Sequence, residues 1–244
     1  MVVLTYNIWD GGGERLGHIA DVIRSQRPDA VAIVEATRGA VEELARGLEL
    51  DFAFGDAVSS PLHVAWLSHL PIERVRNHRS AVFAKTLLEI EVNGIVLLAT
   101  HLASRHEGGT RRRIAEVQEV VEVLRTVADR PRLLVGDLNA LQPEDQVGEP
   151  PPGVRPRGEA ALGAPRTTLE PFTANGDVDC YRRFHPEDPG YTYTAEWPWL
   201  RLDYAFASPT LAPRIRACDV VRTDEAAAAS DHLPLRVEIA ERSA

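Results

Sequence analysis

Polar residues able to bind a metal ion or to move protons follow apolar stretches at several widely separated points of the sequence. Asp137 and Asn139 end the stretch RLLVGDLNA, and Asp231-His232 directly precede the last apolar stretch. Six stretches share this pattern, and the residues concerned are Asn7, Glu35, His101, Asp137, Asn139, Asp203, Asp231 and His232. Any one of them could belong to a turn or a helix cap. Their recurrence indicates instead that rigid strands present them to one common cleft.

The oxygen donors in this set suit a hard divalent cation. Asn7, Glu35 and Asp231 supply amide and carboxylate oxygens, which favour Mg²⁺ or Mn²⁺ over zinc. A zinc hydrolase is further disfavoured because the sequence has no HExxH motif and no cysteine cluster. His101 and His232 can donate to phosphate oxygens or transfer protons near neutral pH.

The remaining residues of the set complete a hydrolytic site. Asp203 could orient His232 by accepting its second N–H, as base-orienting carboxylates do. Asp137 could act as general base on a water, with Asn139 fixing the position of that water or of the phosphate. The set therefore predicts metal-assisted, in-line attack of water on a phosphorus atom.

The elements that must position these residues alternate between strands and helices. Hydrophobic periodicity predicts helices over 14–26, 40–48 and 111–128. It predicts strands over 2–8, 30–36, 63–72, 86–92, 95–102, 132–140, 199–208, 214–223 and 233–240. Asn93-Gly94 predicts a hairpin turn between two of these strands. In the third helix the residues expected to face the core are Ile114, Val117, Val121, Leu124 and Ala128.

Residues 1–244 show no linker that divides two cores, so we expect a single α/β domain. A Pro-, Gly-, Glu- and Arg-rich segment at about 141–168 predicts a long surface loop. Strands mixed with helices and a hairpin suggest two mixed β-sheets packed face to face with helices outside.

The composition indicates a globular protein without a membrane span. The chain has 44% hydrophobic residues and a net charge of −9. Because neutralised phosphates supply much of the affinity of duplex-DNA binders, this charge disfavours tight, sequence-independent DNA binding. No stretch approaches the ~20 apolar residues of a membrane span, and the first residues do not resemble a signal peptide. We expect a cytoplasmic protein, or a secreted one if a leader was removed, and no obligate protein partner is evident.

Six motifs taken in order resemble the endonuclease/exonuclease/phosphatase superfamily, which includes DNase I-like nucleases, neutral sphingomyelinases and inositol polyphosphate 5-phosphatases. They are TYNI, VE, ATHLAS, GDLNA, RLDYAFAS and SDHLPL, and they extend from Asn7 to His232. The pair GDLNA and SDHLP is specific, and RLDY between them strengthens it. The resemblance implies a four-layered α/β sandwich and a divalent-metal phosphodiesterase or phosphatase.

The resemblance also implies a role for each matching residue. Glu35 would be the main metal ligand, joined by Asn7 and Asp231 directly or through water. Asp137 would activate water, and Asn139 would hold that water or the phosphate. His232, paired with Asp203, would stabilise the pentacovalent phosphate. His101 matches the DNase I and sphingomyelinase branches, whereas the exonuclease III branch has tyrosine there.

Three positions depart from the family pattern. Many relatives have Gln before the metal-binding Glu, where this chain has Val34. Exonuclease III-like members carry Asp two residues after the first Asn, where this chain has Trp9. Many relatives have Gln three residues after an Arg in the helix that follows the His motif, where this chain has Arg113 and then Glu116.

Four further residues are candidates for substrate binding. Arg105 and Arg111 belong to a basic run after the THL motif that could grip phosphate or nucleic acid, although a solvated loop and helix start would look the same. Trp9 and Trp197 could stack on a base, although ordinary packing is an equal alternative. The leading hypothesis is a phosphodiesterase or nuclease acting on nucleic acid. The alternatives are a small-molecule or phospholipid head-group phosphoesterase, and a catalytically silent binding module on the same fold.

Overall fold

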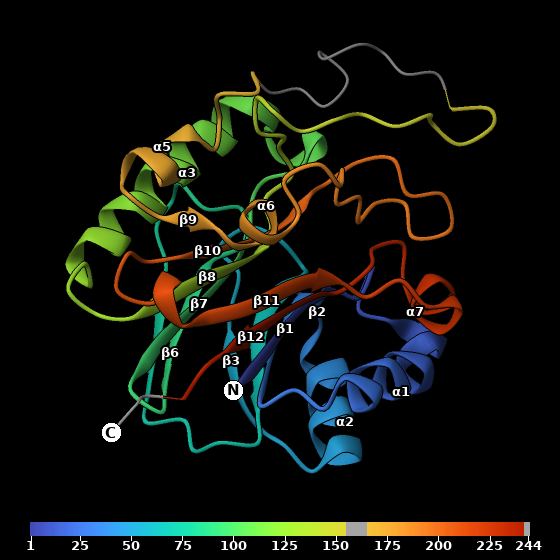
Figure 1. Cartoon of the computed structure of the whole chain (residues 1–244). Helices are drawn as coiled ribbons and strands as arrows, with labels where there is room; N and C mark the ends of the chain where they lie inside the picture. Colours follow the sequence, from blue (N-terminus) through green and yellow to red (C-terminus); the bar gives the residue numbers. More distant parts are fainter. Residues whose placement is uncertain (155–164, 242–244) are drawn as a thin grey trace.

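Two six-stranded mixed sheets form the centre of the computed structural model, which describes residues 1–154 and 165–241 (Figure 1). The first sheet has the order β11 (Ile215–Val220), β12 (Leu235–Ile239), β1 (Val2–Asn7), β2 (Ala30–Ala36), β4 (His63–Ser68) and β3 (Asp51–Gly55). The second has the order β5 (Arg74–His78), β6 (Leu87–Val92), β7 (Ile95–His101), β8 (Arg132–Asp137), β10 (Asp203–Ala207) and β9 (Val178–Asp179). Each sheet contains one parallel pair, β1–β2 or β7–β8, and its other pairs are antiparallel.

Helices cover the outer faces of the two sheets, so the predicted four-layered sandwich is confirmed. The first sheet is covered by α1 (Leu16–Gln26), α2 (Arg38–Leu48) and α7 (Asp224–Ala229), and the second by α3 (Gly109–Thr126) and α5 (Glu170–Ala174) (Figure 1). The short helix α6 (Cys180–Phe184) packs against β10 and β11. Short 3-10 turns lie at Gly13–Arg15, Arg105–Glu107 and Ala212–Arg214. Within the described ranges, no helix is long and apolar enough to cross a membrane.

The strands of the second sheet bury both faces because apolar side chains alternate between two cores. In β7, Leu97 packs into the core between the sheets, while Leu98 packs into the core under α3. In β8, Leu133 and Leu134 divide in the same way. Successive side chains of a strand point to opposite faces, so a continuous apolar run marks a strand covered on both sides.

The parallel pairs carry the site residues to one end of the sandwich. A parallel pair needs a crossover connection, and here α1 joins β1 to β2 while α3 joins β7 to β8. The carboxyl ends of both strands in each pair therefore lie at the same edge. In the second sheet His101 is the register partner of Asp137, and in the first Asn7 pairs with the residue before Glu35.

Local signals explain three boundaries, of which the hairpin turn at Asn93-Gly94 was predicted. Asn93 and Gly94 both take positive φ, of 50° and 71°, in the turn between β6 and β7. Helix α1 ends before Arg27, which adopts the left-handed conformation in front of Pro28. The side chain of Thr37 accepts the N–H of Ala40 and caps α2.

The periodicity missed the short and edge elements, namely β3, β5, β9, α5, α6 and α7. The edge strand β5 reads RVRNH, in which exposed charged residues hide the apolar alternation. Several predicted strands are too long: 63–72 ends at Ser68, 132–140 ends at Asp137, 199–208 begins at Asp203 and 214–223 ends at Val220.

The face predicted for the third helix was partly wrong. Ile114 is 38% exposed, and Ala128 lies exposed beyond the end of α3. The helix instead buries Arg113 and Glu116 beside Val117 and Leu124. The reason is polar contacts, described below, that turn this face toward the loop after β7.

The predicted loop at 141–168 has no helix or strand in its described parts, and residues 155–164 lie outside them. Its start is not a surface segment, however. Leu141, Gln142 and Asp145 are buried, because the segment packs against the chain that precedes β10.

Candidate functional site

Asp137, at the end of β8, is the centre of the contacts among the predicted site residues. Its Oδ2 accepts Nδ2–H of Asn7 at 3.1 Å and lies 3.4 Å from Nε2 of His101 and 3.7 Å from Nε2 of His232. Its Oδ1 accepts the backbone N–H of Asn139 at 2.9 Å. Four segments that are far apart in the sequence therefore meet at one carboxylate.

The backbone around Asp137 takes conformations that restrict the sequence. Gly136 has a φ of 141°, and a Cβ placed there would lie 1.8 Å from the carbonyl oxygen of Thr100 in β7. No other residue fits this position without moving the neighbouring strand. Asn139 and Glu35 are left-handed, with φ of 48° and 59°. Such values are uncommon outside glycine and are enriched at functional positions.

His101 is held as a neutral imidazole. The amide nitrogen of Asn139 donates to the carbonyl oxygen of Leu102 at 3.1 Å and lies 2.9 Å from Nε2 of His101. Because this nitrogen is a donor, Nε2 accepts and the ring proton lies on Nδ1. Burial holds the pKa of His101 well below its usual range, which agrees with a neutral ring.

His232 is held as a cation by its carboxylate neighbours. Its Nδ1–H donates to Oδ2 of Asp203 at 2.8 Å. Burial alone would lower the pKa of His232, but Asp203 and Asp137 raise it to about 10. The ring of Tyr193 lies 4.9 Å from the His232 ring, centroid to centroid. The pairing predicted between His232 and Asp203 is therefore present.

Asp137 itself is unusual among carboxyl groups. Burial raises its pKa to about 7, and the charge of His232 opposes this while Asp203 adds to it. A carboxyl with a pKa in this range can accept a proton and release it again near neutral pH.

Glu35 and Asp231 are the side chains best placed to hold a divalent cation. Oδ1 of Asp231 is buried and has no hydrogen-bond partner in the described part of the chain. Burial raises the pKa of Asp231, and Glu35 and Asp203 raise it further, so these carboxylates lie close enough to repel. Mg²⁺ typically binds one or two carboxylates and keeps several waters. The described residues contain no group of three or more His, Cys, Asp or Glu that could hold a metal, so the fit rests on this pair.

Asn7 takes a different position from the one expected of a direct metal ligand. Its Oδ1 accepts the backbone N–H of Trp9 at 3.0 Å, and its Nδ2–H donates to Glu35 at 3.2 Å as well as to Asp137. The amide therefore bridges the two carboxylates. Oε2 of Glu35 also accepts the N–H of Asp10 at 2.8 Å.

Most of the predicted site residues line a cavity of about 300 Å³, whereas Asn7 and Asp203 lie behind its lining. Sequence reasoning had identified part of its lining, namely Glu35, His101, Arg105, Asp137, Asn139, Asp231 and His232. His106 and Arg113, which belong to the basic run after the THL motif, also line it, whereas sequence reasoning missed Ser104, Tyr193, Leu200 and Leu202. The departure at Arg113 and Glu116 was a signal for this side of the cavity. A larger, open hollow of about 870 Å³ beside α2, β3 and β5 contains none of the predicted site residues.

Three predicted substrate-binding residues lie outside the cavity lining. Arg111 is exposed on the first turn of α3, while Arg113, two residues further, lines the cavity. Trp9 and Trp197 are 49% and 45% exposed. Trp9 follows the Asn7 turn, and Trp197 lies in the same loop as Tyr193.

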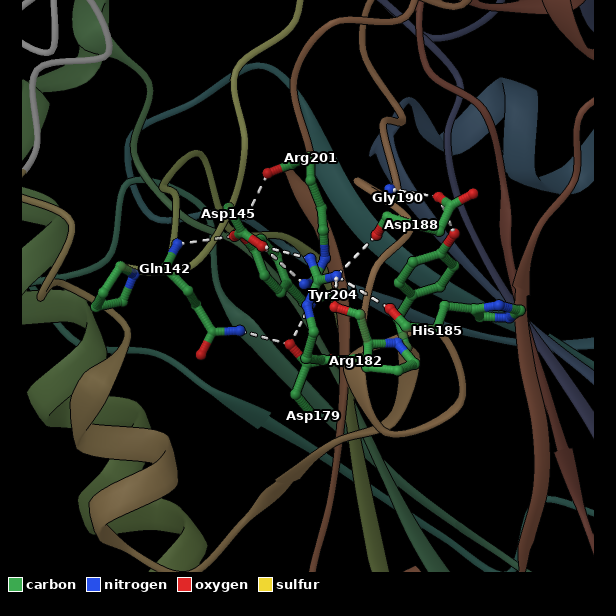
Figure 2. A network of polar contacts seen from close by, with 12 residues as sticks. Gln142, Asp145, Asp179, Arg182, His185, Asp188, Gly190, Arg201 and Tyr204 are labelled. Atoms are coloured by element: carbon green, nitrogen blue, oxygen red, sulfur yellow. Dashed lines mark hydrogen bonds and ion pairs between the residues drawn. The ribbon is translucent and has the colours of Figure 1, made fainter.

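The segment that carries Asp203 is anchored by a second polar cluster, the Arg201 network, shown in Figure 2. We define it as Gln142, Asp145, Asp179, Arg182, Arg201 and Tyr204. Arg201 is buried between Asp145, at 2.9 Å, and Asp179. The hydroxyl of Tyr204 donates to Asp145 at 2.6 Å. The network fixes the residues on both sides of Asp203.

The two facing sheets and the polar residues at their common end define a DNase I-like phosphohydrolase. The model of the Endonuclease/Exonuclease/phosphatase family matches residues 4–232, and the chain belongs to this family. It is accordingly a hydrolase that acts on phosphoester bonds.

Solved structures share this fold at low sequence identity. An AP endonuclease from Archaeoglobus fulgidus is 19% identical with a TM-score of 0.77, and the match covers 98% of this chain and 99% of that one. A 3'-5' exonuclease from Neisseria meningitidis is 17% identical with a TM-score of 0.76, covering 99% and 100%. A 3' phosphatase from Neisseria bound to a product DNA hairpin is 17% identical with a TM-score of 0.75, covering 98% and 99%. A search of curated protein sequences finds no match.

Proposed function

We propose that the protein is a Mg²⁺- or Mn²⁺-dependent phosphodiesterase that acts on nucleic acid. The observation that carries the proposal is the meeting of Asn7, His101, Asn139 and His232 at the carboxylate of Asp137, with Asp203 behind His232. A structural role alone does not account for two imidazoles and two carboxylates buried at one point, because burying unbalanced charge is costly. The solved structures of similar fold include a 3'-5' exonuclease and a 3' phosphatase bound to a product DNA hairpin, and this supports nucleic acid as the substrate.

In the proposed reaction, water attacks the phosphorus in line with the bond that breaks. Asp137 accepts the proton of this water, and Asn139 fixes the position of the carboxylate and of His101. The imidazolium of His232, oriented by Asp203, donates to a phosphate oxygen and balances the growing negative charge. The leaving oxygen takes a proton from solvent. A divalent cation held by Glu35 and Asp231 would neutralise phosphate charge and favour the ionised form of the carboxyls nearby.

A small phosphodiester is the second candidate substrate. The net charge of −9 works against tight binding of a long polyanion, and the cavity of about 300 Å³ is large enough for a small ester. Both candidates use the same residues at the reacting phosphate. They differ in what binds outside it.

The test is a substrate panel with the purified protein. Plasmid DNA, single-stranded DNA, RNA and bis-(p-nitrophenyl) phosphate are each incubated with Mg²⁺, with Mn²⁺ and with excess chelator. We expect hydrolysis with at least one cation and none in chelator. Turnover that survives chelation would contradict metal dependence, and hydrolysis of the nitrophenyl ester alone would favour a small substrate.

A further inference from the structure

The mouth of the cavity carries an arginine and a histidine that the reaction above does not use. Arg105 and His106 are exposed and line the cavity. Within residues 1–154 and 165–241, neither side chain has a hydrogen bond, an ion pair or a ring contact. Both are therefore available to a ligand without breaking an internal contact.

The turn that presents them is rigidly held. Ser104 and Glu107 form a reciprocal capping box around Arg105 and His106. Glu107 also pairs with the buried Lys85, which is the only lysine in the chain. The one carboxylate of this turn is therefore already neutralised and does not offset the charge of Arg105.

Two side chains of helix α3 form hydrogen bonds with the backbone just before this turn. The carboxylate of Glu116 accepts the N–H of Ala103 at 2.6 Å and that of Ala84 at 2.8 Å. The guanidinium of Arg113 donates to the carbonyl oxygen of Ala103 at 2.7 Å. Ala103 lies two residues after His101, so the turn with Arg105 and His106 has a fixed position relative to His101.

Arg112 also holds the turn, and its guanidinium is occupied by contacts within the protein, unlike that of Arg105. Its guanidinium donates to the carbonyl oxygens of Phe83 at 2.6 Å, Val82 at 2.9 Å and Glu107 at 3.2 Å. Arg112 therefore holds the turn in place, and Arg105 remains free to bind.

The exposed fraction of the side chains differs between the floor and the mouth of the cavity. Asp137, His101 and His232 at its floor are 2%, 3% and 4% exposed, whereas Arg105 and His106 at its mouth are exposed. Arg105 and His106 are exposed at the open side of the cavity, so they face a group that projects outward from a phosphate held at the floor. The guanidinium of Arg105 and the ring N–H of His106 are hydrogen-bond donors, and the charged donor favours an anion.

We propose that Arg105 and His106 form a subsite for a second phosphate, adjacent along a nucleic-acid strand to the one that is cleaved. This inference rests on the proposed function and deepens it by naming the substrate class, an ester that carries at least two phosphates. Arginine is suited to the subsite because its planar guanidinium can contact two phosphate oxygens at once. The arrangement also gives an acidic protein an arginine, unpaired within the described ranges, at the point where a polyanion would leave the cavity.

The experiment compares thymidine 3′,5′-bisphosphate with the 3′- and the 5′-monophosphate as competitive inhibitors of bis-(p-nitrophenyl) phosphate hydrolysis. Whichever phosphate of the bisphosphate enters the floor, the other faces the mouth, so the polarity of binding need not be known. Free Mg²⁺ is held constant because nucleotides bind it. We expect the wild-type inhibition constant for the bisphosphate to be lower by about tenfold than for either monophosphate, the size of one charge-assisted contact.

Arg105→Ala should remove most of this advantage, and His106→Gln part of it, when the three inhibition constants of each variant are compared with one another. Arg46→Ala is the matched control, since Arg46 is an exposed arginine on α2 outside this cavity. The inference is overturned if wild type binds the bisphosphate no more tightly than the monophosphates. It is equally overturned if the double variant, Arg105→Ala with His106→Gln, keeps the tighter binding of the bisphosphate.

Calorimetry of the same three nucleotides with the protein separates this inference from the proposed function. It measures the bisphosphate advantage without turnover. A protein that shows the advantage but hydrolyses no ester would overturn the proposed function alone. Hydrolysis without the advantage would overturn the subsite alone.

Discussion

Two buried polar clusters lie on either side of the segment around Asp203, and they differ in how completely their charges are paired. In the Arg201 network every carboxylate oxygen of Asp145 and Asp179 accepts at least one hydrogen bond (Figure 2). At the floor of the cavity, Oδ1 of Asp203 and Oδ1 of Asp231 are buried without a partner in the described ranges.

The two clusters also differ in the balance between positive and negative side chains. The Arg201 network sets two arginines, Arg182 and Arg201, against two aspartates. The catalytic cluster, which we define as Asn7, Glu35, His101, Asp137, Asn139, Asp203, Asp231 and His232, has four carboxyl groups and one imidazole whose pKa is raised. A cluster whose carboxylates are all paired with arginines stabilises the fold, whereas one with excess negative charge is suited to a cation and a substrate.

The largest difference should appear on removal of the central carboxyl. Asp137→Asn keeps the shape of the side chain but removes the proton acceptor. We expect kcat for bis-(p-nitrophenyl) phosphate to fall by about 10³-fold or more, within the range for loss of a general base. Steady-state kinetics measure this, and circular dichroism checks the fold. Retention of most of the activity would assign proton transfer to another residue.

The reverse pattern is expected for the Arg201 network. Arg201→Met leaves Asp145 and Asp179 buried with less compensation, so the free energy of unfolding should fall by about 3–5 kcal/mol. Turnover per folded molecule should fall far less than in Asp137→Asn, because Arg201 does not line the cavity and acts only by holding the segment around Asp203. Urea denaturation and kinetics on the same preparation give both values. A loss of activity without loss of stability would place this network in the catalytic machinery.

The affinity for Mg²⁺ should depend on Glu35 and Asp231 and not on carboxylates elsewhere in the protein. Glu35→Gln removes one of the two carboxylates placed for the cation, and we expect the Kd for Mg²⁺ to rise by at least about tenfold. Calorimetry measures the affinity. Glu42→Gln on the exposed face of α2 is the control and should bind as wild type does. Unchanged affinity in Glu35→Gln would remove Glu35 from the metal site.

The smallest effect should be on the stability of Asp137→Asn, which we expect to exceed that of wild type by an amount that depends on pH. The pKa of Asp137 is raised from 3.8 to about 7 on folding, so the unfolded chain releases this proton at lower pH than the folded one. Wild type therefore loses stability as pH rises through this window, and Asp137→Asn does not. We expect the variant, in chelator, to exceed wild type by about 1 kcal/mol or more at neutral pH and by little near pH 4. A difference that does not change with pH would contradict the raised pKa.

Most of the fold and much of the site could be predicted because their signals are local. Apolar runs marked the central strands, and Asn93-Gly94 marked the hairpin. The elements that were missed are short or lie at edges, where burial is incomplete and periodicity is weak. The predicted roles of the site residues stay predictions, although the structure brings Asn7, His101, Asn139 and His232 to Asp137.

The sequence by itself determined which chemistry is available, because residue type decides whether a group can bind a cation, accept a proton or donate to phosphate. Only the tertiary structure decided which of these groups share a cavity. It selected Arg113 over Arg111 and turned the oxygen of Asn7 toward Trp9. It also buried Glu116 against two backbone N–H groups. These outcomes depend on contacts between segments tens of residues apart, and no local pattern records them.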